Sequence, residues 1–187
     1  MIVDVETSAL VVIDLQKGIV GMPVEPYSGA EVVSRAAAMA ALFRQKDGFV
    51  VLVRVATHDG KDMLRPDADV APPLGERPKD WSQIVPELQA SESDYILTKR
   101  QWGAFYGTDL DLQLRRRGIK TIVLCGIATG IGVDTTAREA YQRGYRQYFV
   151  EDAMSGISTR EHEYVTQTIF PRIGHVVRSR DVLAWLN

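Results

Sequence analysis

Hydrophobic and polar positions fall into blocks along the chain that favour a parallel β-sheet covered by helices. The apolar runs are short, rich in Val, Ile and Leu, and continuous rather than alternating, which is typical of strands buried on both faces. The strands predicted in this way are Ala9–Ile13, Phe49–Val55, Tyr95–Leu97, Thr121–Leu124, Gln147–Val150 and His175–Val177. Because segments with helical spacing separate them, the order of elements predicts right-handed crossovers and an α/β fold.

Four segments between the strands carry helical signals. The segment Glu31–Gln45 places its apolar residues on one stripe. In the segment 109–118 the leucines alternate as they would in a strand, but Asp109 is a suitable N-cap and Gly118 a suitable stop, so a helix is predicted. The other two predicted helices are Val133–Gly144 and Thr159–Phe170.

The segment Thr57–Ser82 differs from the rest of the chain because it has little periodicity. It holds four of the eight prolines, together with scattered charges. Segments of this length without regular structure usually act as lids, oligomer contacts or mobile segments. No repeat, low-complexity tract or linker interrupts the chain, and 187 residues favour a single domain spanning 1–187.

The amino-acid composition limits the kinds of molecule with which the protein is expected to interact. The 22 basic and 24 acidic residues leave no strong field to attract nucleic acid or an anionic membrane. A single cysteine excludes an internal disulfide framework and suits a reducing compartment. The N-terminus has no basic region followed by a long apolar stretch, and no run reaches the roughly 18 apolar residues of a membrane span. We therefore expect a cytoplasmic protein that acts on a small molecule.

Polar residues follow the predicted strands where a site is expected. Asp14 comes directly after the first strand, with Gln16 close behind it, and Lys99 follows the third. Parallel strands bring their carboxyl ends to one edge, where ligands bind in open α/β sheets. A lysine would favour the ionised form of Asp14 whereas burial would raise its pKa, and such opposition can tune a carboxyl group for proton transfer. The alternative is that Asp14 caps a turn and Lys99 is solvated.

The stretch GIATGIGVDTTAREA (126–140) follows the fourth predicted strand and is predicted to turn into a helix. Gly130 and Gly132 would let the backbone approach a ligand, and amides at a helix N-terminus can stabilise a developing oxyanion. The spacing is not GxGxxG and no acidic residue follows at the distance a ribose needs, so dinucleotide binding is weakly supported. Cys125 lies inside the strand and is interpreted as a small buried hydrophobe.

Taken together, Asp14, Lys99 and the IATGIGVDTTAREA turn resemble the isochorismatase-like hydrolase superfamily. The resemblance runs from ALVVIDLQKGI to YQRGYRQYFVEDAMSG and implies a Rossmann-like, three-layer fold with a six-stranded parallel sheet. Most members use a nucleophilic Cys beside an Asp and a Lys, and in this chain the Cys position is Gly132. The resemblance further implies oxyanion amides at Ala128 and Gly132 and a cis peptide between Ile127 and Ala128.

The glycine removes the thiolate on which covalent catalysis in nicotinamidases, carbamoylsarcosine-type amidases and ureidoacrylate-type hydrolases depends. Isochorismatases of the same superfamily also have Gly there, and they hydrolyse a vinyl ether with an Asp as general acid and water as the nucleophile. The resemblance therefore implies a hydrolase that uses Asp14 and Lys99 on an unassigned substrate. The segment RVATHDGKDMLRPDADV does not reproduce the isochorismate contacts. The alternatives are a catalytically silent binding or scaffold protein, and an amidase with an Asp-activated water.

Aromatic residues after Lys99 are candidates for the pocket. Trp102 and Phe105 could hold a small planar substrate, with Gln16 and Thr129 nearby, although ordinary packing would explain the two rings equally well. The threonines of the turn are interpreted as turn and packing hydroxyls, because no His is placed to activate them.

No metal or other cofactor is predicted for this chain. His58 and Asp59 have no matching second histidine, and surface roles explain all three histidines. The covered sheet and the Pro-rich segment favour a homo-oligomer.

Overall fold

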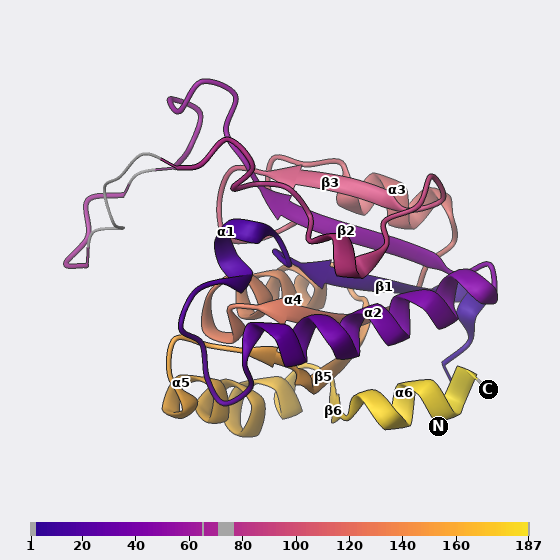
Figure 1. The fold of residues 1–187 in the computed structure, drawn as a ribbon. Coiled ribbons are helices and arrows are strands. Elements are labelled where there is room, and N and C mark those ends of the chain that lie inside the picture. Colours follow the sequence, from indigo (N-terminus) through magenta and orange to yellow (C-terminus); the bar gives the residue numbers. More distant parts are fainter. Residues whose placement is uncertain (1–2, 65, 71–76, 187) are drawn as a thin grey trace.

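The structure is a computed structural model that describes residues 3–64, 66–70 and 77–186. Its centre is a six-stranded, all-parallel sheet with the strand order β3-β2-β1-β4-β5-β6 (Figure 1). The strands are β1 (Ser8–Ile13), β2 (Phe49–Val55), β3 (Tyr95–Lys99), β4 (Thr121–Ile127), β5 (Arg146–Ser155) and β6 (His175–Val177). The predicted α/β fold is thus confirmed.

Helices cover both faces of this sheet. The α-helices are α1 (Lys17–Val20), α2 (Gly29–Gln45), α3 (Leu110–Arg116), α4 (Asp134–Gln142), α5 (Thr159–Tyr164) and α6 (Ser179–Leu186). Helices α2 and α6 pack on one face, and α3, α4 and α5 lie behind the sheet in Figure 1. Successive residues of β1 point to opposite faces, so Val12 joins the core under α2 and Val11 the core under α3 and α4. No helix within the described residues is long and apolar enough to cross a membrane.

Short helical turns link these elements. The 3₁₀ turns are Val5–Thr7, Pro86–Leu88 and Phe170–Arg172, and the π-helical turns are Thr129–Val133 and Val165–Ile169. The predicted helix 159–170 is therefore three consecutive pieces, and the helix predicted from Val133 begins as a π-turn at Thr129. Residues 57–64 and 66–70 extend outward beyond the carboxyl end of β2 (Figure 1), and the chain returns to α1 at Trp81, whose carbonyl oxygen accepts from the amide of Gly18.

Two strands run further than the sequence pattern predicts. Strand β4 continues to Ile127 because Gly126 adopts a φ of 126°, and a Cβ there would lie 2.1 Å from the carbonyl oxygen of Ile13. Strand β5 continues to Ser155. Asp152 therefore lies inside β5 and accepts hydrogen bonds from the amide and hydroxyl of Ser179, so it fixes the start of α6.

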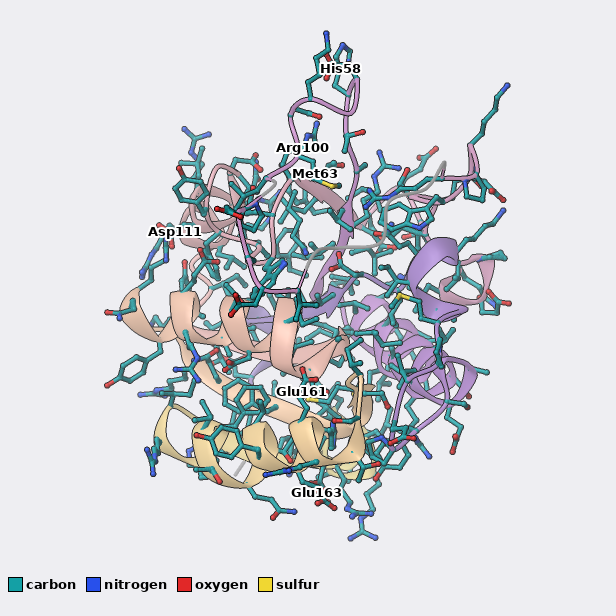
Figure 2. The ribbon with its side chains drawn as sticks, turned by 90° about the vertical axis from the view of Figure 1, so that its left-hand side faces the viewer. His58, Met63, Arg100, Asp111, Glu161 and Glu163 are labelled. Atoms are coloured by element: carbon teal, nitrogen blue, oxygen red, sulfur yellow. The ribbon has the colours of Figure 1, made fainter. Side chains whose placement is uncertain are left out.

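The strand order places the switch point of the sheet between β1 and β4. Chain connections leave these adjacent strands in opposite directions, toward β2 on one side and β5 on the other. In open α/β sheets the crevice at the carboxyl ends of such strands is the usual ligand site. Figure 2 looks onto this end of the molecule, where Glu161 of α5 lies on the side of that helix that faces α4.

Candidate active site

Asp14 and Lys99 meet at the carboxyl edge of the sheet. Asp14 follows the last residue of β1 and Lys99 is the last residue of β3, and Lys99 Nζ donates to Asp14 Oδ2 over 2.7 Å. Lys99 Nζ also donates to the carbonyl oxygen of Gln101 over 3.1 Å. Both side chains are almost completely buried, with 2% exposure for Lys99 and 6% for Asp14. The structure therefore brings the two residues together as the sequence predicts, and neither is solvated.

Two effects of opposite sign act on the pKa of the Asp14 carboxyl group. Burial raises the pKa of the Asp14 carboxyl to about 6, although the charge and hydrogen bond of Lys99 act in the opposite direction. Its Oδ1 atom is buried and has no hydrogen-bond partner among the described residues. Asp14 also adopts a φ of 53°, which is uncommon for a residue with a side chain and is characteristic of functional sites. The carboxyl group thus has one oxygen fixed by Lys99 and one that is free to hold a proton.

Gly132 faces this carboxyl group from the turn after β4. A Cβ at Gly132 would lie 3.2 Å from Asp14 Oδ2, 3.1 Å from Cγ2 of Ile13 and 3.5 Å from the carbonyl oxygen of Trp102. A side chain at position 132 would therefore be directed at Asp14, in a space that a small group fits after slight adjustment. The peptide between Ile127 and Ala128 is cis, as the family resemblance implies.

Two threonines hold the turn from opposite sides. Thr136 Oγ1 donates to the carbonyl oxygen of Gly132 over 2.7 Å and accepts from the amide of Ala104 over 3.1 Å, which ties the turn to the segment after Lys99. Thr129 Oγ1 lies 2.9 Å from Nδ1 of His162 on α5. The interpretation of these hydroxyls as packing groups is confirmed for Thr136. For Thr129 the expectation that no histidine lies nearby is wrong, because Nδ1 of His162 contacts its hydroxyl.

The remaining predicted pocket residues have different surroundings. Phe105 is buried in the core beside Tyr145, with ring centroids 5.9 Å apart, so it packs under the segment instead of lining a pocket. Trp102 is 61% exposed, and its backbone carbonyl oxygen is one of the three atoms nearest to a Cβ at Gly132. Thr129 is completely buried.

Gln16 is a structural clamp. Its Nε2 donates to the carbonyl oxygens of Val55 and Trp81 over 3.1 and 3.2 Å, and its Oε1 accepts from the amide of Val55 over 2.8 Å. These three bonds use the donors and the acceptor of the amide group, so the side chain is committed to the protein backbone.

His162 is the residue that the sequence analysis missed. It was interpreted as a surface histidine, but it is 4% exposed, and burial lowers the pKa of its imidazole. Its position on the inward stripe formed by residues 162, 165, 166 and 169, at helical spacing, is the signal that would have placed it inside. Within the described ranges no group of three or more His, Cys, Asp or Glu side chains is arranged to hold a metal ion.

A family model described as the isochorismatase domain matches residues 8–181. The chain belongs to the isochorismatase family. An uncharacterised family protein of Bacillus subtilis, YwoC, is 56% identical over 174 residues, which cover 92% of this chain and 90% of that one. A solved isochorismatase family protein from Burkholderia thailandensis is 47% identical with a TM-score of 0.93, covering 97% of this chain and 96% of its own. The solved structure of N-carbamoylsarcosine amidase from Thermoplasma acidophilum is 31% identical with a TM-score of 0.77. The match covers 92% of this chain and 96% of that one.

The geometry around Gly132 predicts that a thiol introduced there will be reactive. In the Gly132→Cys variant, we expect iodoacetamide to alkylate the introduced thiol at least about 100-fold faster than Cys125, measured by peptide mass spectrometry. Cys125 is buried in β4, and burial raises the pKa of its thiol to about 12. The parent protein serves as the control and should be alkylated only after unfolding. Equal labelling of both cysteines would show that position 132 does not face an accessible site.

Proposed function

We propose that this isochorismatase-family protein hydrolyses a small metabolite by proton transfer at Asp14, with water in place of an enzyme thiolate. The observation that carries the proposal is the Asp14 carboxyl group, whose Oδ2 accepts from Lys99 while Oδ1 has no partner among the described residues. Its pKa of about 6 leaves part of the population protonated near neutral pH. Gly132 leaves space beside this group where a thiol would otherwise be directed.

The reaction class that fits these groups best is vinyl-ether hydrolysis of the isochorismate type. Asp14 Oδ1 donates its proton to the terminal alkene carbon, and the ether oxygen stabilises the resulting oxocarbenium ion. Water then attacks the cationic carbon, its proton returns to Asp14, and the hemiketal collapses to pyruvate and an alcohol. The Lys99 ammonium stabilises the Asp14 carboxylate while the proton is on the substrate.

Amide hydrolysis is the second candidate, and the likeness to N-carbamoylsarcosine amidase favours it. Here the Asp14 carboxylate would act as the base for a water that attacks a carbonyl carbon. Backbone amides of Ala128 and Gly132, at the start of the helical segment that continues into α4, would then face the developing oxyanion. The products would be ammonia or an amine and a carboxylate.

The pH dependence of turnover separates the two candidates. A general acid must hold its proton, so for vinyl-ether hydrolysis we expect kcat/KM to fall about tenfold per pH unit above the Asp14 pKa of about 6. A general base must have lost its proton, so for amide hydrolysis kcat/KM should rise up to about pH 6 and then become constant. The measurement is pyruvate release from isochorismate and ammonia release from carbamoyl compounds, each on both sides of the Asp14 pKa.

A catalytically silent binding protein is the remaining interpretation of the same site. It predicts that a ligand raises the midpoint of thermal unfolding while no product accumulates above the uncatalysed rate. The same panel of compounds serves for this test. Pyruvate or ammonia release above that rate in the parent protein would contradict silent binding.

A further inference from the structure

The turn after β4 has a hydrogen bond to α5 that the proposed chemistry does not use. Thr129 Oγ1 lies 2.9 Å from His162 Nδ1, and the two side chains are 0% and 4% exposed. Helix α5 begins behind the N-cap Ser158, whose hydroxyl accepts from the amide of Glu161. His162 therefore lies in the first turn of α5, opposite the first residue of the turn that carries Gly132.

The imidazole of His162 is fixed by its surroundings. The Tyr27 ring meets it edge-on, with ring centroids 6.3 Å apart. Tyr27 is itself anchored to the end of β5, because its amide donates to Ser155 Oγ and its carbonyl oxygen accepts from the same hydroxyl. Glu25 also accepts from the amide and hydroxyl of Thr159 at the start of α5. The ring thus presents Nδ1 to Thr129 from a fixed position.

On this side of the turn Thr129 is the residue whose side chain can anchor it. The next residue, Gly130, lies directly against the carboxylate of Glu161, and a Cβ there would be 2.0 Å from Glu161 Oε1. Gly132 likewise has no side chain, and its carbonyl oxygen accepts from the hydroxyl of Thr136. The turn is also held by the buried side chain of Val133 and by hydrogen bonds from the amides of Ile131 and Val133 to the carbonyl oxygen of Ala128. The hydroxyls of Thr129 and Thr136 add side-chain contacts to neighbouring elements, which its glycines cannot make.

Thr129 is not a nucleophile in this arrangement. Its side chain is completely buried, and its hydroxyl is engaged with Nδ1 of His162. Burial also lowers the pKa of His162 and keeps the ring neutral near neutral pH, a state in which one ring nitrogen accepts and the other donates. A neutral imidazole hydrogen-bonded to a hydroxyl is a polar anchor inside the protein, and its contacts are with the turn rather than with substrate.

We propose that His162 is a positioning residue that acts through Thr129 to hold the Ala128–Gly132 turn against Asp14. This inference deepens the proposed function and rests on it, because the turn matters for turnover only if its backbone faces the substrate. A shift of the turn by a fraction of an ångström would separate Gly132 from the Asp14 carboxyl group. A misplacement of about 1 Å can cost an enzyme about a hundredfold in rate, and smaller shifts proportionately less.

Two pairs of variants separate the hydrogen bond from packing. Thr129→Val keeps the shape of the side chain and removes the hydroxyl, whereas Thr129→Ser keeps the hydroxyl and removes a methyl group. His162→Leu removes the polar atom, whereas His162→Asn retains one near the place of Nδ1. We expect kcat/KM to fall by about tenfold or more in Thr129→Val and His162→Leu and to stay within about threefold of the parent in the other two.

The double variant Thr129→Val with His162→Leu tests whether the two residues act as one unit. Its loss in kcat/KM should be close to that of either single variant rather than the product of the two. The opposite order within a pair, with Thr129→Val active and Thr129→Ser impaired, would overturn the proposal, because it would assign the role to packing. Losses that follow the midpoint of thermal unfolding across all variants would overturn it as well.

A second readout needs no substrate and keeps this test separate from the proposed function. Gly132→Cys places a reporter thiol on the turn, and its alkylation rate by iodoacetamide depends on where the turn holds it. In this background we expect the rate to change by about threefold or more with Thr129→Val and His162→Leu, and to be restored with Thr129→Ser and His162→Asn. If the parent turns over none of the compounds, the proposed function fails while this readout still applies. Equal alkylation rates in all backgrounds would overturn the role of His162.

Discussion

Replacing Asp14 with asparagine is expected to lower kcat/KM by about 10²–10⁴-fold, the usual contribution of a general acid or base. Asparagine has nearly the shape of the aspartic acid but cannot deliver or accept the proton at Oδ1, the oxygen that has no other partner among the described residues. The measurement is product release from the compound that the parent protein turns over, with initial rates compared at the Asp14 pKa of about 6 and at neutral pH.

Asp111→Asn provides the matched control for this variant. It makes the same chemical change on the surface of α3, where the carboxylate accepts from Tyr145 and pairs with Arg115. We expect it to keep the kcat/KM of the parent within about twofold, in line with the small effects of exposed charges. An Asp14→Asn variant that is folded and retains full turnover would remove Asp14 from the reaction and would contradict the proposed function.

Replacing Lys99 with methionine is expected to lower the free energy of unfolding at about pH 8 by about 3–5 kcal/mol. The loss arises because methionine leaves the Asp14 carboxylate buried without its counter-ion, and an unpaired buried charge is among the most destabilising single changes. The measurement is urea unfolding at about pH 8 and at about pH 5, on either side of the Asp14 pKa.

The sign of the pH effect follows from the Asp14 pKa. Burial raises the pKa of this carboxyl group above its unfolded value, and without Lys99 it should rise further, because the lysine is the partner that lowers it. Below the folded pKa the group is protonated and needs no counter-ion. The stability lost in Lys99→Met should therefore be smaller in the acidic measurement than in the alkaline one.

Two further variants identify the buried pair as the cause. Lys17→Met breaks the exposed ion pair with Asp80, whose side chains are 42% and 48% exposed, and should leave the midpoint of urea unfolding nearly unchanged. The double variant Asp14→Asn with Lys99→Met removes both buried charges and should recover most of the loss. Equal losses in Lys99→Met and Lys17→Met would exclude the buried pair as the source of the effect.

Sequence patterns were sufficient for the sheet and for the meeting of Asp14 with Lys99. Continuous apolar runs identify strands buried on both faces, and parallel strands necessarily bring their carboxyl ends to one edge. The pairing across 85 positions in the chain thus follows from topology, without any local signal that joins the two residues.

Side-chain surroundings were harder to predict, because they depend on packing between elements distant in sequence. Trp102 and Phe105 both follow Lys99, yet the ring of Trp102 is exposed and that of Phe105 is in the core. The predicted fourth strand ends at Leu124, but β4 continues to Ile127 because Gly126 has no Cβ to clash with the Ile13 carbonyl oxygen. Helical spacing indicates that His162 points inward, but its contact with Thr129 depends on how α5 packs against the turn after β4.

The clamp formed by Gln16 has a consequence for how the length of the segment Thr57–Ser82 can change. One side chain joins the backbone at Val55, where the long Pro-rich excursion begins, to the backbone at Trp81, near its end. Once both ends are fixed, each doubling of the length between them costs only about 0.6 kcal/mol in closure entropy. The amides of Ala56 and Leu64 donate to the carbonyl oxygens of Lys99 and Arg100, so insertions and deletions that leave the Asp14–Lys99 pair in place are expected after Leu64. Grafts between relatives should therefore be joined after Leu64 and before Trp81, with Gln16 retained.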